Sequence, residues 1–156
     1  MKDVHALLNE YGESHQNPVN KAVHWICVPV ILWTIVALLW LIPFPGSIKL
    51  GGYPLNWAIL ALALLQIYYF RLSLSLAVGM LGVIVAMLWL IHWVEANISW
   101  PLWQLAVGLF VVAWVGQFIG HAIEGKRPSF FKDLQFLMIG PAWLLSFVYK
   151  KAGIRI

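Results

Sequence analysis

Charged side chains are scarce in this sequence. Ten Lys and Arg and six Asp and Glu make up 10% of the 156 residues, whereas 62% of the residues are hydrophobic. A soluble domain carries about 25% charged residues, because its surface must be covered with polar groups. The scarcity of charge therefore excludes an ordinary soluble domain and predicts an integral membrane protein, for which lipid replaces much of the water.

Cysteine is nearly absent as well. The single cysteine, Cys27, cannot form an intrachain disulfide, and its place in an apolar run is typical of a small buried residue. Basic residues give a net charge of +4, but they form no stripe interleaved with exposed aromatic residues, so we expect no nucleic acid partner. Residues 1–16 lack the basic region, apolar core and cleavage site of a signal peptide, and we expect no processing.

Long apolar runs, in contrast, occupy most of the chain. A helix needs about 20 apolar residues to cross about 30 Å of hydrocarbon, and in lipid it must satisfy its backbone hydrogen bonds internally. Four runs meet or nearly meet this length, and they predict spanning helices over residues 22–42, 55–70, 72–94 and 102–123. Residues 1–156 have room for a single membrane domain.

Two further segments flank these runs. Residues 130–149 are apolar but contain the pair Gly140-Pro141, and proline interrupts the hydrogen bonds of a helix, so this segment spans, dips in and returns, or lies along the interface. We therefore predict an all-α polytopic membrane helix bundle of about four spanning helices, with an N-terminal amphipathic helix and a C-terminal broken or re-entrant helix. The amphipathic helix covers residues 3–14 and has apolar side chains at helical spacing: Val4, Leu7, Leu8 and Tyr11.

Basic residues indicate how the bundle is oriented, because Lys and Arg are enriched on the cytoplasmic side. Lys21 precedes the first span, Arg71 separates the second from the third, and more basic residues follow the fourth, whereas the other side has Lys49. Both ends of the four-span unit are therefore expected to be cytoplasmic, in the inner membrane of a bacterium or the endoplasmic reticulum of a eukaryote. Basic residues near position 150 favour the same side, which argues against a crossing by residues 130–149.

This orientation brings three histidines to one face of the membrane. His15 and His24 lie at the start of the first span and His121 at the end of the fourth, whereas His92 lies at the opposite face. Asn17 is a favourable N-cap and Pro18 a favourable first helical residue. A helix that starts there places Asn20 and His24 on the same face as the cap.

The end of the fourth span carries a second polar stripe. Gln117, His121 and Glu124 share one face of the predicted helix. Gly116 and Gly120 lie on a neighbouring face, and small residues let another helix approach closely. The two polar stripes are therefore expected to face each other.

Histidine side chains of this kind suit a metal, because imidazole is the commonest protein ligand of divalent first-row ions. The candidate ligands for Fe, Zn or Mn are His15, His24 and His121, and His5 is a further candidate, for which a surface position is the alternative. The alternative for the whole group is that it only anchors helix ends at the interface. The candidate catalytic residues, polar groups that could orient the imidazole rings, are Asn20, Gln117 and Glu124.

The same residues form two motifs that resemble a known family. The first motif reads His15-x-Asn17-Pro18-x-Asn20-x-x-x-His24, and the second reads Gln117-Phe118-x-Gly120-His121 with Glu124 and Arg127-Pro128 after it. Together they resemble the signatures of the yeast-type 2-hydroxy fatty acid dioxygenases. The likeness extends to the pattern of spans and covers nearly the whole chain.

The resemblance implies an activity and its components. Eukaryotic members of that family are membrane proteins of the endoplasmic reticulum whose iron(II)-dependent dioxygenation shortens 2-hydroxy fatty acids by one carbon. For this chain it implies Fe(2+) held by the three histidines, a 2-hydroxy fatty acid and O2 as substrates, and Lys21, Lys126 or Arg127 as groups that attract the carboxylate. Two alternatives are a non-enzymatic lipid-binding or scaffold protein of the membrane and a metal-dependent membrane hydrolase.

Overall fold

The structure is a computed structural model and describes residues 3–46, 48–50, 53–125 and 130–156. Two strands of two residues each, β1 (Lys49–Leu50) and β2 (Tyr53–Pro54), pair antiparallel, and all other regular structure in these ranges is helical. The predicted all-α fold class is confirmed. The helices are α1 (Val4–Glu13), α2 (Pro18–Leu41), α3 (Trp57–Leu72), α4 (Leu74–Asn97), α5 (Leu102–Glu124) and α6 (Phe130–Ala152).

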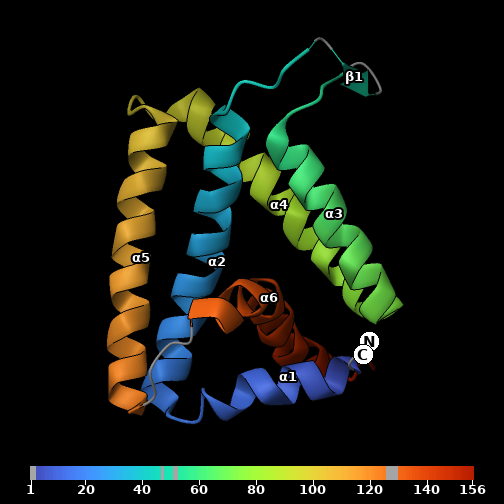
Figure 1. Cartoon of the computed structure of the whole chain (residues 1–156), viewed down its shortest axis with the longest axis vertical. Coiled ribbons are helices and arrows are strands. Elements are labelled where there is room, and N and C mark those ends of the chain that lie inside the picture. Colours follow the sequence, from blue (N-terminus) through green and yellow to red (C-terminus); the bar gives the residue numbers. More distant parts are fainter. Residues whose placement is uncertain (1–2, 47, 51–52, 126–129) are drawn as a thin grey trace.

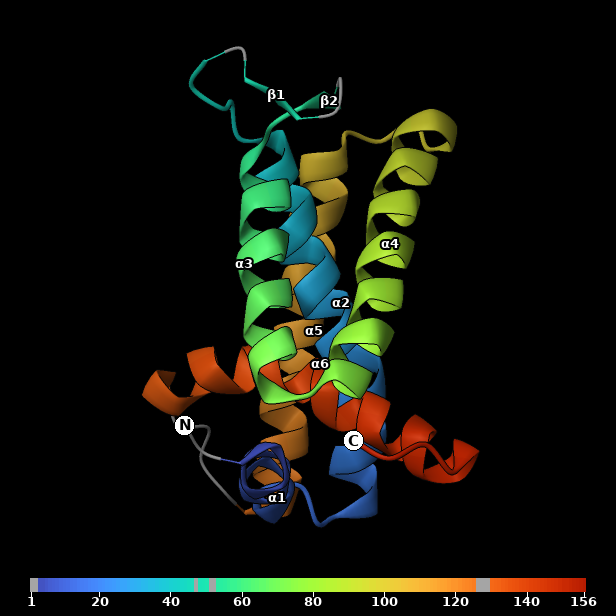
Figure 2. The same ribbon diagram turned by 90° about the vertical axis from the view of Figure 1, so that its right-hand side faces the viewer.

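The helices run in two different directions. α2, α3, α4 and α5 form a bundle, and α1 and α6 lie across the end at which α2 begins and α5 ends (Figure 1). Figure 2, turned by 90°, shows α6 passing across the bundle, and α6 packs against α1, α2 and α4. One end of the bundle is therefore covered by two transverse helices.

Capping residues set where the helices begin. The side chain of Asn17 accepts a hydrogen bond from the backbone N–H of Val19 at 2.8 Å, and Pro18 is the first helical residue, as predicted. Such a cap satisfies one of the donors that the first helical turn leaves unpaired. Ser73 caps α4 in the same way and also ends α3, since its backbone N–H donates to the carbonyl of Tyr69 at 3.0 Å. α3 and α4 therefore form a hairpin with a single residue between them.

α2 and α5, the first and last of the long helices, pack closely side by side (Figure 1). A Cβ atom added at Gly116 would meet the Sγ atom of Cys27 at 2.8 Å, and one added at Gly120 would overlap the side-chain oxygen of Asn20. The prediction that these glycines admit a neighbouring helix is confirmed. Cys27, predicted to be buried, is half-buried in this contact.

The outward faces of the long helices are apolar. Ile26, Trp89 and Val112 expose 70%, 64% and 69% of their surface, as lipid-facing residues do. Among the described residues, α2, α4 and α5 are long and apolar enough to cross a membrane. α3, the predicted second span, is apolar but has 16 residues. It is therefore about 24 Å long, less than the hydrocarbon thickness of about 30 Å.

α1 and α6 form one packed unit. The apolar residues predicted for the amphipathic helix, Tyr11 among them, are all buried and share a core cluster with Ile139 and Trp143 of α6. α6 is helical through Pro141, and its ribbon bends near the middle (Figure 1), so the predicted break takes the form of a bend. Because α6 lies across the bundle and not beside the long helices, its position agrees with the expectation that this segment does not cross the membrane.

Candidate metal centre

Three histidines from separate segments meet at the covered end of the bundle. His15 lies in the turn between α1 and α2, His24 in the second turn of α2 and His121 in the last turn of α5. Their ring centroids are 4.2 Å apart for His15 and His24, 5.0 Å for His24 and His121, and 5.3 Å for His15 and His121. His15 and His24 are 2% and 1% exposed, and His121 is half-buried. The predicted convergence of these side chains is confirmed.

Backbone carbonyl groups hold two of the rings. Nδ1 of His15 lies 2.6 Å from the carbonyl oxygen of Tyr11, and Nδ1 of His24 lies 2.9 Å from that of Asn20. Because a carbonyl oxygen only accepts, Nδ1 carries the proton in both rings, and Nε2 keeps the lone pair with which a neutral imidazole binds a metal. Metal-binding histidines commonly donate from their second nitrogen in this way.

The three rings fit one metal ion. Their ligand atoms all lie within 4.8 Å of one another. Two metal–nitrogen bonds of about 2 Å span at most about 4 Å, so small side-chain shifts bring the three nitrogens to a common ion. Neutral imidazoles suit iron, zinc, copper and nickel, and three of them leave positions open for other ligands. The donor set therefore fits a divalent transition metal, and ligation by these histidines stays a prediction.

Glu124 connects the end of α5 with the loop before α2. Its Oε1 atom accepts a hydrogen bond from the backbone N–H of Gln16 at 2.8 Å. Its Oε2 atom accepts from the backbone N–H of Asn17 at 2.8 Å and from the side-chain amide of Asn20 at 3.1 Å. Because both oxygens are engaged in these bonds, the carboxylate positions the segment that carries His15.

Asn20 and Gln117 lie closer to the rings. Both side chains are buried, and the Gln117 side chain lies close to His24. The backbone carbonyl of Asn20 holds His24, while its side chain bonds Glu124, so Asn20 links the two. A catalytic role for Asn20, Gln117 and Glu124 stays a prediction.

Two aromatic residues that the sequence did not connect with the site cover His15. The ring of Tyr11 stacks on the imidazole, with centroids 4.2 Å apart and planes at 10°, and the indole of Trp143 lies 5.4 Å away. Both side chains are buried. The feature of the sequence that relates to this contact is Gly140. A Cβ atom at this position would meet the Tyr11 hydroxyl at 3.0 Å, so the glycine lets α6 approach α1 closely.

Other predicted residues lie elsewhere. His5, the further candidate ligand, is exposed on α1 and lines a different pocket. His92 lies at the far end of α4, as predicted, and its Nδ1 atom is 3.7 Å from Oε2 of Glu95. The remaining motif and carboxylate-attracting residues, Lys126, Arg127 and Pro128, lie outside the described residues.

The fold and the histidine group define a class: a helical membrane protein with a candidate three-histidine metal site at one end of its bundle. A family model described as 2-hydroxy-palmitic acid dioxygenase Mpo1-like matches residues 1–152, and the chain belongs to this family. It is similar to 2-hydroxy-palmitic acid dioxygenase MPO1 of Saccharomyces cerevisiae, with 31% identity over 153 residues, which cover 95% of this chain and 81% of the yeast protein. No solved structure matches the chain. The family resemblance carried by the two motifs is confirmed.

Proposed function

We propose that the protein is a dioxygenase that uses iron(II) and O2 to convert a 2-hydroxy fatty acid into the acid one carbon shorter. The observation that carries the proposal is the group of His15, His24 and His121, whose ligand atoms lie within reach of one ion. The family supports the reaction type, since the yeast relative is named for dioxygenation of 2-hydroxy-palmitic acid. An apolar bundle with the site at one end suits a substrate that has a long acyl chain and a polar head.

Iron bound by the three histidines supplies activation of O2 and a Lewis acid for the hydroxyl and carboxylate of the substrate. The protein supplies position and shielding. Backbone carbonyls fix the rings of His15 and His24, and Glu124 fixes the loop before α2. Tyr11 and Trp143 cover His15 and keep water from that side. Lys21, in the first turn of α2, adds a positive charge that attracts the substrate carboxylate to this end of the bundle.

The proposed reaction balances without an added reductant. One 2-hydroxy acid and one O2 give the shorter fatty acid, CO2 and water. The bond between C1 and C2 breaks, and the substrate supplies all of the electrons that O2 accepts. We therefore expect O2 consumption equal to substrate loss, with no requirement for a nicotinamide or an oxoacid co-substrate.

O2 uptake by the purified, iron-loaded protein tests this proposal. With 2-hydroxypalmitate we expect O2 to be consumed and pentadecanoate to form, whereas palmitate, which lacks the hydroxyl group, gives neither. His121→Ala should abolish both signals, and His92→Ala, at the far end of the bundle, is the matched control that should retain them.

Two outcomes would overturn the proposal that the protein is a dioxygenase. Metal-dependent release of a lipid product without O2 uptake would favour the membrane hydrolase. Absence of stoichiometric iron or zinc, with the same lipid binding in the wild type and in His121→Ala, would favour the non-enzymatic lipid-binding or scaffold protein.

A further inference from the structure

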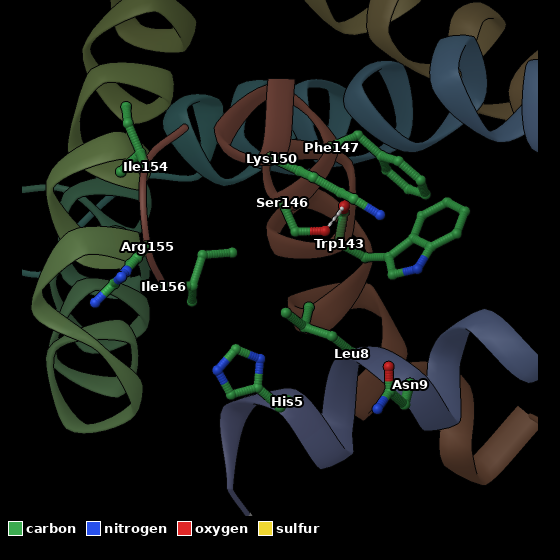
Figure 3. Close-up of a pocket in the computed structure, with 10 residues that line it drawn as sticks. All are labelled: His5, Leu8, Asn9, Trp143, Ser146, Phe147, Lys150, Ile154, Arg155 and Ile156. Carbon is green, nitrogen blue, oxygen red and sulfur yellow. Dashed lines mark hydrogen bonds between the residues drawn. The ribbon is translucent and has the colours of Figure 1, made fainter. Parts of the chain in front are cut away.

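A pocket of about 610 Å³ lies between α1 and the C-terminal part of the chain. In Figure 3, His5 and Leu8 extend into it from α1, and Trp143, Phe147 and Lys150 belong to α6 on the opposite side. Its volume lies in the range of about 300–1,000 Å³ that is typical of small-molecule sites. The proposed reaction at the three histidines does not use this pocket.

The lining of the pocket combines apolar and basic side chains. Leu8, Trp143 and Phe147 supply apolar walls, whereas Lys150 and Arg155 carry positive charge. No Asp or Glu side chain is among the described residues that line it, so the two cationic side chains face no acidic side chain within the pocket. A ligand that matches both features has an anionic end and an apolar body.

The position of the pocket narrows the choice of ligand. Trp143 lines the pocket and also contacts His15, with ring centroids 5.4 Å apart, so pocket and metal centre share this side chain as a wall. The pocket is also lined by α1 and α6, the two helices that cross one end of a bundle whose outer faces are apolar (Figure 1). An amphiphilic molecule in a membrane keeps its polar head at the interface. This position favours a ligand that partitions into the membrane and binds beside the three histidines.

We propose that this pocket binds a long-chain fatty acid through its carboxylate, held by Lys150. It is a second lipid site, separated from the three histidines by Trp143. The choice of a fatty acid among amphiphilic anions rests on the proposed function. The Lys150 ammonium and the carboxylate form a charge-assisted pair, and the acyl chain packs on Leu8 and Phe147.

Equilibrium binding of radiolabelled palmitate to the purified full chain tests this site. Palmitate lacks the 2-hydroxyl group, so it reports the pocket without turnover. We expect Lys150→Glu to weaken palmitate binding at least tenfold. Lys151→Glu is the matched control, because Lys151 is exposed, adjacent and does not line the pocket, and it should weaken binding less than twofold. Equal effects of the two substitutions would overturn the proposal.

Two further arms identify the ligand chemistry. Hexadecanol has the same chain length and no charge, and it should compete with palmitate at least tenfold more weakly than unlabelled palmitate does. Equal competition would overturn the role of the carboxylate. Competition by dipalmitoyl phosphatidate at lower concentrations than palmitate would assign the pocket to a phospholipid headgroup and would also overturn the proposal.

One variant separates this inference from the proposed function. His121→Ala removes a histidine of the metal centre and leaves every pocket residue in place. We expect it to bind palmitate as the wild type does, even though it turns over no 2-hydroxy acid. If the wild type does not turn over the 2-hydroxy acid but its palmitate binding is still weakened by Lys150→Glu, the dioxygenase proposal is rejected and the pocket proposal is retained. Loss of palmitate binding in a folded His121→Ala would place the acid at the histidines and reject the pocket.

Discussion

At the scale of single residues, Glu124 acts on the loop that carries His15. Its carboxylate accepts hydrogen bonds from the backbone of Gln16 and Asn17 and from the side chain of Asn20. Hydrogen bonds to an ionised acceptor are about twice as strong as neutral ones, so this carboxylate holds the loop firmly. Its removal loosens the position of His15 without removing a histidine.

Glu124→Gln tests this positioning role. The substitution replaces one acceptor oxygen by an NH2 group that faces N–H donors, so at least one of the three hydrogen bonds is lost. We expect iron affinity and turnover to fall about tenfold, since groups that orient metal ligands typically contribute about 10–100-fold. Metal titration and O2 uptake measure the effect. Glu95→Gln, at the far end of α4, is the control, and an unchanged iron affinity in Glu124→Gln would contradict the positioning role.

The histidines could be placed from the sequence, whereas their aromatic cover could not. Successive spans alternate in direction, which brings the start of the first span and the end of the fourth to one face of the membrane. The position of His24 and His121 at these ends of long apolar runs was sufficient to predict that they meet. Tyr11 and Trp143 also lie in apolar patterns, but such patterns fit any packed helix equally well. Their contact with His15 depends on how α1 and α6 cross, which periodicity does not report.

At the scale of helices, the contact between α2 and α5 sets the separation of His24 and His121. Gly120 faces Asn20, whose side chain is fully buried and donates to Glu124 and to the carbonyl of Ser14. Because these bonds hold Asn20, it has little room to move away from an added methyl group. The site geometry is therefore sensitive to the size of residue 120.

Gly120→Ala should force α2 and α5 apart. We expect the free energy of unfolding to fall by about 1–3 kcal/mol, the usual cost of overpacking, together with weaker metal binding. Gly108→Ala is the matched control on the same helix, because a Cβ atom there has nothing within 4 Å. Thermal unfolding in detergent compares the two variants. Equal stabilities of the variants would show that the helices tolerate a wider spacing.

α3 and α6 show the limits of reading elements from the sequence. Hydropathy predicted α3 as a span, and the structure gives an apolar helix that is too short for a full crossing without thinning of the bilayer. For α6 the apolar run and the Gly140-Pro141 pair allowed three arrangements, and the basic residues near position 150 argued against a crossing. Its transverse position follows from its packing against α1, α2 and α4, and such contacts between distant segments are not encoded in local composition.

At the scale of the whole molecule, the histidine group joins the α1–α2 turn, α2 and α5. An ion that binds only the folded protein stabilises it by mass action, by about 2.7 kcal/mol at 100 times its dissociation constant. We expect iron(II) without O2, or zinc, to raise the unfolding temperature and a chelator to reverse the rise. His24→Ala should abolish this shift, and His5→Ala should keep it, since His5 lies outside the histidine group. A shift that survives in His24→Ala would place the metal elsewhere.

The pairing of the first long helix with the last has a consequence for biosynthesis. The ribosome delivers His15 and His24 well before His121, and Glu124 follows at the very end of α5. Until α5 packs beside α2, the nascent chain contains only two of the three histidines of the group. A metal site that needs all three histidines, as proposed, would therefore form only after α5 packs against α2, and a chain truncated before α5 would lack it.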